Sequence, residues 1–157
     1  MDNIIDTTRR LGASVVCNEN CIRIVSAGTI QGGFFKTGIY PSFPTDLQPI
    51  LATILLRSKD DSVVEETVFE NRFGVVRELK KLGAHIAICH SCMMVSGGVI
   101  LKGAQVNALD LRQGAAMVVA GMISSGTTVV VNTEYILRGY ENIVKDLQGL
   151  GVHIDYI

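Results

Sequence analysis

Apolar residues recur at helical spacing in two stretches of the chain, and each stretch ends at a Leu-Gly pair. Residues 75–82 and residues 143–150 both place apolar side chains on one helix face, with charged or polar residues between them. A third pair, Leu11-Gly12, follows residues 1–10, which have the pattern of a helix end. Glycine suits these positions because it has no Cβ and adopts the left-handed conformation at a helix end. The pattern predicts three helices that each stop at a glycine and lead into a strand.

Short apolar runs after the first two glycines predict β-hairpins. The first hairpin is expected to join strands at 14–17 and 21–25, and the second to join strands at 84–89 and 92–96. The other predicted elements are a strand at 103–108, helices at 45–57 and 109–124, and strands at 62–66 and 127–132.

The predicted elements repeat along the chain in the order helix, hairpin, strand, helix, strand. We expect one domain over residues 1–157 with internal repeats at about 11–81 and 82–150, in the α/β (α+β) class. In this frame the chain begins in the helix of one unit. It ends in the first strand of another, after Gly151.

Composition narrows the functional classes. Of the 157 residues, 48% are hydrophobic and only 18% are charged, with a formal net charge of −1. This balance argues against a nucleic-acid binder, which usually carries a basic patch, and against a disordered chain. No apolar run reaches the roughly 18 to 20 residues of a membrane helix. The polar, acidic start of the chain does not resemble a signal peptide, so we expect a cytoplasmic protein without membrane or nucleic-acid partners.

Charged residues return to matching places in the two repeats, at predicted helix entrances. Asp46 and Asp110 begin helices, and Arg112 follows in the first turn of the second helix. Arg72 and Arg138 lie between a strand and the next helix. Thr45 or Asp46 can cap the first of these helices and Asp110 the second, and each arginine can be a solvated surface residue. Together they favour a site for an anionic small molecule, because guanidinium groups bind carboxylate and phosphate in a bidentate fork.

The cysteines and histidines offer weaker signals. Cys17 and Cys21 flank the first predicted turn, and residues 89–92 form a Cys-x-x-Cys sequence at the second. Such a pair can be half of a zinc site or a redox pair, but small buried thiols are common, and we predict no metal site. His85 and His153 take matching strand positions, which favours a structural role over catalysis.

Several motifs, in order and without obvious gaps, resemble the UDP-N-acetylglucosamine 1-carboxyvinyltransferases of the enolpyruvyl transferase family. The matching segments are Tyr-Pro-Ser-Phe-Pro-Thr-Asp-Leu-Gln at 40–48, Glu-Thr-Val-Phe-Glu-Asn-Arg-Phe at 66–73, Gly-Ala-Gln-Val at 103–106, Asp-Leu-Arg at 110–112 and Arg-Gly-Tyr-Glu at 138–141. The resemblance implies a C-terminal portion of such an enzyme. The family fold is an inverse α/β barrel of two domains, each with three βαββαβ units, and the chain would hold about two units of one domain.

The resemblance also implies an activity and roles for residues. The reaction moves enolpyruvyl from phosphoenolpyruvate to the 3-hydroxyl of UDP-N-acetylglucosamine in peptidoglycan synthesis, without a cofactor. By motif, Asp46 would contact that hydroxyl as general base, and Asp110 would help move protons at the pyruvyl methylene. Arg72 and Arg112 would lie near the phosphoenolpyruvate carboxylate, and Arg138 would close on the phosphate side.

Two further positions come from the same resemblance: Val68, with Phe69 beside it, would touch the sugar nucleotide. The family's reactive-cysteine loop and its lysine-asparagine pair lie in another part of the enzyme and have no match here. We therefore expect the chain to need the missing N-terminal portion and to be inactive alone.

Two alternative functions stay open. One is a 3-phosphoshikimate 1-carboxyvinyltransferase-like enzyme, and the other is a non-enzymatic remnant that binds ligand or self-associates through exposed sheet edges.

Overall fold

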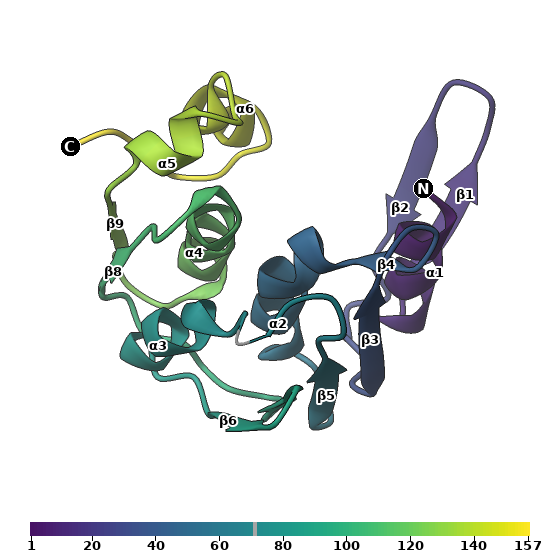
Figure 1. The fold of residues 1–157 in the computed structure, drawn as a ribbon. Coiled ribbons are helices and arrows are strands. Elements are labelled where there is room, and N and C mark those ends of the chain that lie inside the picture. The colour runs from purple at the N-terminus through teal and green to yellow at the C-terminus, as the bar shows by residue number, and fades with distance from the viewer. Residues whose placement is uncertain (71) are drawn as a thin grey trace.

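The computed structural model describes residues 1–70 and 72–157, and Figure 1 shows how their helices and strands are arranged. Helix α1 (Asp2–Arg10) opens the chain and leads into the antiparallel hairpin of β1 (Ser14–Cys17) and β2 (Ile22–Val25). This hairpin projects from the rest of the molecule beside α1 (Figure 1). Its Val15 is 7% exposed, but Ile24 on the paired strand is 59% exposed. The hairpin is therefore buried only where it meets the helix.

A five-stranded sheet forms the middle of the fold, in the order β4-β3-β5-β7-β6. Its strands are β3 (Phe34–Gly38), β4 (Phe43–Pro44), β5 (Ser62–Glu65), β6 (Ile86–Cys89) and β7 (Cys92–Val95). Strand β3 runs parallel to both β4 and β5, whereas β7 is antiparallel to β5 and β6. The mixed sheet agrees with the predicted α/β (α+β) class.

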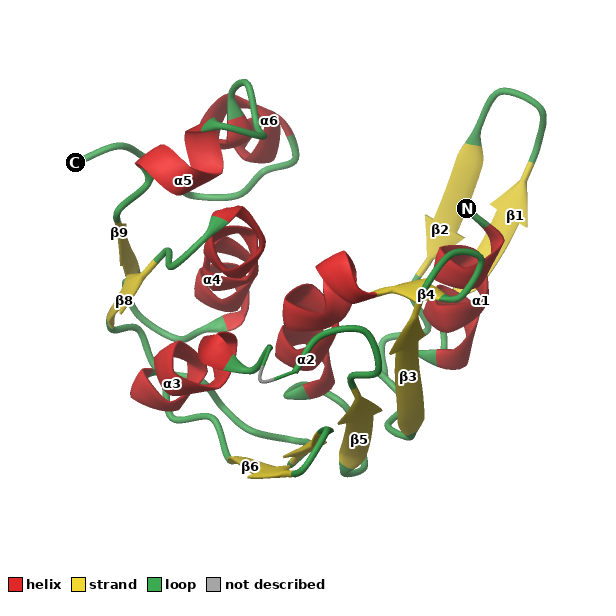
Figure 2. Ribbon diagram, in the orientation of Figure 1, coloured by secondary structure: helices red, strands yellow, loops and turns green. Residues whose placement is uncertain are grey.

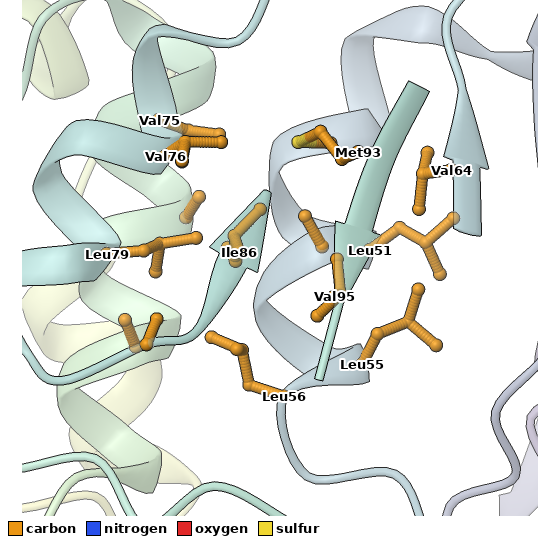
Figure 3. Packing of buried hydrophobic residues seen from close by; sticks show 14 of the residues in the cluster. Leu51, Leu55, Leu56, Val64, Val75, Val76, Leu79, Ile86, Met93 and Val95 are labelled. Carbon is orange, nitrogen blue, oxygen red and sulfur yellow. The ribbon is translucent and has the colours of Figure 1, made fainter. Parts of the chain in front are cut away.

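Helices cover this sheet and supply most of the core. The 3-10 turn η1 (Thr45–Leu47) leads into α2 (Gln48–Leu55), which packs beside α4 (Leu111–Ile123), while α3 (Gly74–Lys81) packs against α4 (Figure 2). Figure 3 shows side chains of α2 and α3 meeting those of β5, β6 and β7. Leu55, Leu79 and Met93 are fully buried there. Full burial of a leucine or methionine side chain contributes about 1.5–3 kcal/mol, so this cluster holds α2 and α3 in fixed positions.

The C-terminal part forms a smaller layer. Strands β8 (Gln105–Asn107) and β9 (Val129–Val131) make a parallel pair, and the short helices α5 (Glu134–Leu137) and α6 (Ile143–Gly149) follow. The strand predicted after Gly151 is wrong, because residues 152–157 form no strand. A strand needs a neighbour to bond with, and β6 in the middle of the fold has β7. Within the part of the chain that the structure describes, residues 152–157 have no such neighbour.

The three Leu-Gly helix ends are confirmed. Gly12, Gly83 and Gly151 have φ values of 99°, 92° and 88°, which residues with a Cβ rarely adopt. In both halves the helix end also bonds to the segment that follows the hairpin. Lys102 N donates to Leu82 O at 2.9 Å, and Gln31 N donates to Leu11 O at 3.0 Å. These paired contacts support the predicted repeats, whose boundaries stay a prediction.

One of the two helix-capping predictions is confirmed and the other is wrong. Asp110 caps α4 as expected, and its Oδ1 accepts from the backbone N–H groups of Arg112 and Gln113 at 2.8 Å each. The prediction that Thr45 or Asp46 caps its helix is wrong, because neither side chain accepts a capping hydrogen bond and α2 starts only at Gln48. The intervening 3-10 turn leaves the Asp46 carboxylate free to point elsewhere. None of the described helices is long and apolar enough to cross a membrane.

Candidate active site

Three charged side chains from separate segments meet where η1, the segment after β5 and the start of α4 converge. Arg72 Nη2 donates to Asp46 Oδ1 at 2.9 Å. Arg112 donates from Nε to Asp46 Oδ1 and from Nη2 to Asp46 Oδ2, the latter at 3.2 Å. The fold therefore brings together three of the residues that the sequence analysis selected, and one carboxylate faces two guanidinium groups.

The electrostatics of this cluster follow from its hydrogen bonds. The hydrogen bond from Arg112 lowers the pKa of Asp46; partial burial opposes this, and Arg72 lowers it further. In turn, the Asp46 carboxylate raises the pKa of Arg112. The Asp46 side chain is 54% exposed, so solvent or a ligand can reach it. The cluster thus presents an ionised, accessible carboxylate whose basicity the two arginines restrain.

A buried acid that the sequence analysis did not select supports this cluster. Glu66 is 3% exposed, and Thr45 Oγ1 donates to its Oε2 at 2.8 Å. Arg72 Nη1 donates to Thr45 Oγ1 at 2.8 Å. Glu66 therefore holds Thr45, which holds Arg72 against Asp46. One feature of the sequence could have identified Glu66: it ends the apolar strand predicted at 62–66. A charged residue buried in such a strand needs a specific partner.

The backbone of Val68 and Phe69 is held by the same glutamate, Glu66. Their backbone N–H groups donate to Glu66 Oε1 at 2.9 and 3.2 Å. The Phe69 ring lies under the Arg72 guanidinium, 4.6 Å from its centroid, and stays 54% exposed. The segment after β5 thus places an exposed aromatic face beside the charged cluster. Asn71, which belongs to the same motif, lies outside the described residues.

Asp110 stands beside the cluster but is used differently. Besides capping α4, its Oδ2 accepts from Gln113 Nε2 at 2.7 Å. Its negative charge also helps to raise the pKa of Arg112. In this structure the carboxylate therefore fixes the start of the helix that carries Arg112. Its predicted role in proton transfer stays a prediction.

Arg138 is not brought to the cluster in this structure. It is exposed after α5 and stacks over the Tyr135 ring, 5.5 Å from the centroid. In the part of the chain that the structure describes, no hydrogen bond joins a cysteine or histidine side chain to Asp46, Arg72 or Arg112. Cys89 and Cys92 face each other across the β6–β7 hairpin as free thiols. Among the described residues, no group of three or more His, Cys, Asp or Glu side chains gathers to hold a metal ion.

Comparisons with known proteins show the family of the chain. Residues 1–147 match the EPSP synthase (3-phosphoshikimate 1-carboxyvinyltransferase) family. The chain belongs to the enolpyruvyl transferase family. It is 42% identical over 156 residues to a UDP-N-acetylglucosamine 1-carboxyvinyltransferase of Finegoldia magna, and 40% identical over 154 residues to one of Clostridium botulinum. The resemblance to this family seen in the sequence motifs is therefore confirmed.

Both matches cover 98% of this chain but only 37% of each relative. The enolpyruvyl transferase NikO from Streptomyces tendae has a similar structure, with a TM-score of 0.88 and 27% identity over 98% of this chain and 36% of that one. An EPSP synthase from Acinetobacter baumannii shares the fold more distantly, with a TM-score of 0.64 and 21% identity over 87% of this chain and 35% of that one. The chain thus has the length of about a third of an enolpyruvyl transferase.

Proposed function

We propose that this chain forms part of a cytoplasmic transferase that moves enolpyruvyl from phosphoenolpyruvate to the 3-hydroxyl of UDP-N-acetylglucosamine, releasing phosphate for peptidoglycan synthesis. The observation that carries the proposal is the Asp46 carboxylate held between Arg72 and Arg112. The relatives at about 40% identity are sugar-nucleotide transferases by name. In this assignment the chain contributes one wall of a cleft and is inactive alone.

The cluster has the groups that such a transfer needs. Phosphoenolpyruvate carries a carboxylate and a phosphate, and Arg72 and Arg112 offer the guanidinium forks that bind such anions. In the free chain both forks hold Asp46. A substrate carboxylate that took over these donors would raise the pKa of Asp46 towards its ordinary value. Substrate binding would then turn a restrained carboxylate into a better base.

The proposed step balances with one base and one acid. The acceptor hydroxyl gives its proton to Asp46 while its oxygen bonds to C2 of phosphoenolpyruvate and a proton adds to C3. Loss of phosphate from C2 and of a proton from C3 restores the double bond on the new ether. We assign the C3 proton to Asp110, and the phosphate side to Arg138 after closure of the cleft. Val68 and Phe69 would contact the sugar nucleotide from the exposed segment beside Arg72.

The fold assignment is extended in the same way. We propose that the chain supplies about two of three βαββαβ units in the C-terminal domain of an inverse α/β barrel. The helix, hairpin and strand order of both halves supports this, as do the matching backbone hydrogen bonds at Leu11 and Leu82. The missing N-terminal portion of the enzyme would be its partner and supply the other wall.

A chimaera tests the function. The 157 residues would replace the matching segment of the Finegoldia magna transferase, and phosphate release from phosphoenolpyruvate would be measured with UDP-N-acetylglucosamine or shikimate 3-phosphate. The isolated chain would be assayed in parallel. We expect release from the chimaera only, and only with the sugar nucleotide. Release only with shikimate 3-phosphate would favour the sister activity. No release from a folded chimaera would favour a remnant that keeps the fold without the reaction.

A further inference from the structure

A cavity of about 570 Å³ lies between α1, β3 and the segment that joins β3 to β4. Its lining includes Thr7 and Arg10 from α1, Phe35 and Lys36 from β3, and Phe43. It contains none of Asp46, Arg72 or Arg112. We propose that this cavity binds a small carboxylate with an apolar body. The volume falls within the range of about 300–1,000 Å³ typical of small-molecule sites.

In the second half of the chain, a carboxylate lies between the equivalent helix and strand. There, Glu78 of α3 is fully buried and faces β8. Its Oε2 accepts from Lys81 Nζ at 2.6 Å, from Asn107 N at 2.8 Å and from Asn107 Nδ2 at 3.2 Å. A carboxylate therefore joins the helix to the strand.

The first half has an equivalent helix and strand but no carboxylate between them. Aligning Leu82-Gly83 with Leu11-Gly12 pairs Glu78 with Thr7 and Lys81 with Arg10, and the same shift pairs Asn107 with Lys36. The backbone supports this alignment on both sides. Gln31 N donates to Leu11 O at 3.0 Å, and Lys102 N donates to Leu82 O at 2.9 Å, so both the donors and the acceptors keep the same shift. The site thus has cations at the places of Lys81 and of the neutral Asn107, but a hydroxyl where the acid would be.

The charges around the cavity leave Arg10 available. Lys36 pairs with Glu65 at 3.2 Å, and Asp6 pairs with Arg9 at 3.3 Å. Arg10 donates to the backbone carbonyl of Phe34 and stacks on the Phe35 ring at 4.7 Å. Among the described residues, no carboxylate lies within ion-pair distance of Arg10. A bound carboxylate would take the place that Glu78 holds beside Lys81.

The polar and apolar parts of the lining define the ligand. Thr7 is 7% exposed, and no hydrogen bond joins its hydroxyl to another described residue, so it can donate to a bound oxygen. Phe35, 3% exposed, and the half-buried Phe43 provide an apolar wall. A carboxylate with a compact aryl or alkyl body matches both parts, and phenylacetate is a suitable probe.

Titration of the isotopically labelled chain with phenylacetate tests the proposal, with shifts read at the Thr7 and Lys36 amides. We expect saturable shifts, and none with the neutral analogue 2-phenylethanol. Arg10→Met should weaken binding about tenfold or more, since it removes a charge-assisted contact. Arg23→Met, on the exposed β2 strand, is the matched control and should bind normally.

A gain-of-contact variant completes the test. Thr7→Glu should supply the carboxylate internally, abolish phenylacetate binding and raise Tm by about 2–4 °C. Circular dichroism of each variant establishes that it is folded. Non-saturating shifts, equal binding of the neutral analogue, or equal affinity of the Arg10→Met and Arg23→Met chains would each overturn the proposal.

Discussion

Arg112 donates hydrogen bonds to Asp46 from two nitrogens, although 66 positions separate the two residues in the sequence. Its Nε donates to Oδ1 and its Nη2 to Oδ2, at 3.2 Å for the second contact. A bidentate pair fixes orientation as well as distance. It therefore sets the position of the η1 turn relative to the start of α4, and with it the centre of the proposed site.

Replacing Arg112 by lysine should raise the pKa of Asp46. Arg112 is the largest cause that lowers this pKa from its ordinary 3.8, and a lysine ammonium lacks the planar fork. The stabilisation from this pair is present above pH 3.8 and lost as the pH falls through the lowered pKa. An NMR titration of the Asp46 side chain would measure the change. An unchanged pKa would show that Arg72, or the positive charge that lysine keeps, is enough to hold it low.

Asp110→Ala should destabilise the chain by about 1 kcal/mol, because α4 loses its N-cap. Asp110→Asn should cost little, since asparagine caps about as well as aspartate. Thermal unfolding of the three chains measures this difference. In the active chimaera, however, Asp110→Asn should lower turnover, because an amide cannot deliver a proton. Full activity of the asparagine variant would restrict Asp110 to its structural role.

Glu78→Gln should destabilise the chain at neutral pH by roughly 2 kcal/mol, because a buried charged acceptor is lost. Burial opposes ionisation of Glu78, but hydrogen bonds from Lys81 and Asn107 outweigh it and lower its pKa from 4.5 to about 2. Since the folded pKa is lowered, this contribution is full above pH 4.5 and fades as the pH falls towards 2. Urea unfolding at several pH values should show the two chains converge in acid. A constant difference would contradict this assignment.

Self-association should depend on the exposed hairpin. Ile24 is 59% exposed on β2, and β2 bonds only to β1 among the described strands. An unpaired apolar edge of this kind favours edge-to-edge contacts. We expect the isolated chain to form dimers or larger species by light scattering, and Ile24→Lys to reduce them. A monomeric parent chain over the same concentrations would exclude this association.

Periodicity predicted the elements well where local pattern decides them. The hairpins, the glycine helix ends and the Asp110 cap depend on nearby residues and were all anticipated. The strand predicted after Gly151 is absent from residues 152–157, because strand formation depends on a partner strand, which the local pattern does not show. Asp46 failed as a cap because long-range contacts with Arg72 and Arg112 use its carboxylate.

The site was only partly predictable for the same reason. Matching positions in the repeats pointed to Asp46 and Arg72, and a cation in the first turn of a predicted helix pointed to Arg112. The structure joins all three. Glu66 escaped notice because its role depends on Thr45 and on the backbone of a turn, contacts that sequence spacing does not indicate. Arg138 stacks on Tyr135 instead of joining the cluster, so its predicted role on the phosphate side stays a prediction.

The most direct test of the central claim is the turnover of the Asp46→Asn chimaera with phosphoenolpyruvate and UDP-N-acetylglucosamine. Asp60→Asn, at an exposed turn, serves as the matched control. If Asp46 is the base, its amide variant should lose about 100-fold or more in kcat, while the control keeps its rate. Turnover of a folded Asp46→Asn chimaera within twofold of the parent would contradict the claim that this carboxylate carries the reaction.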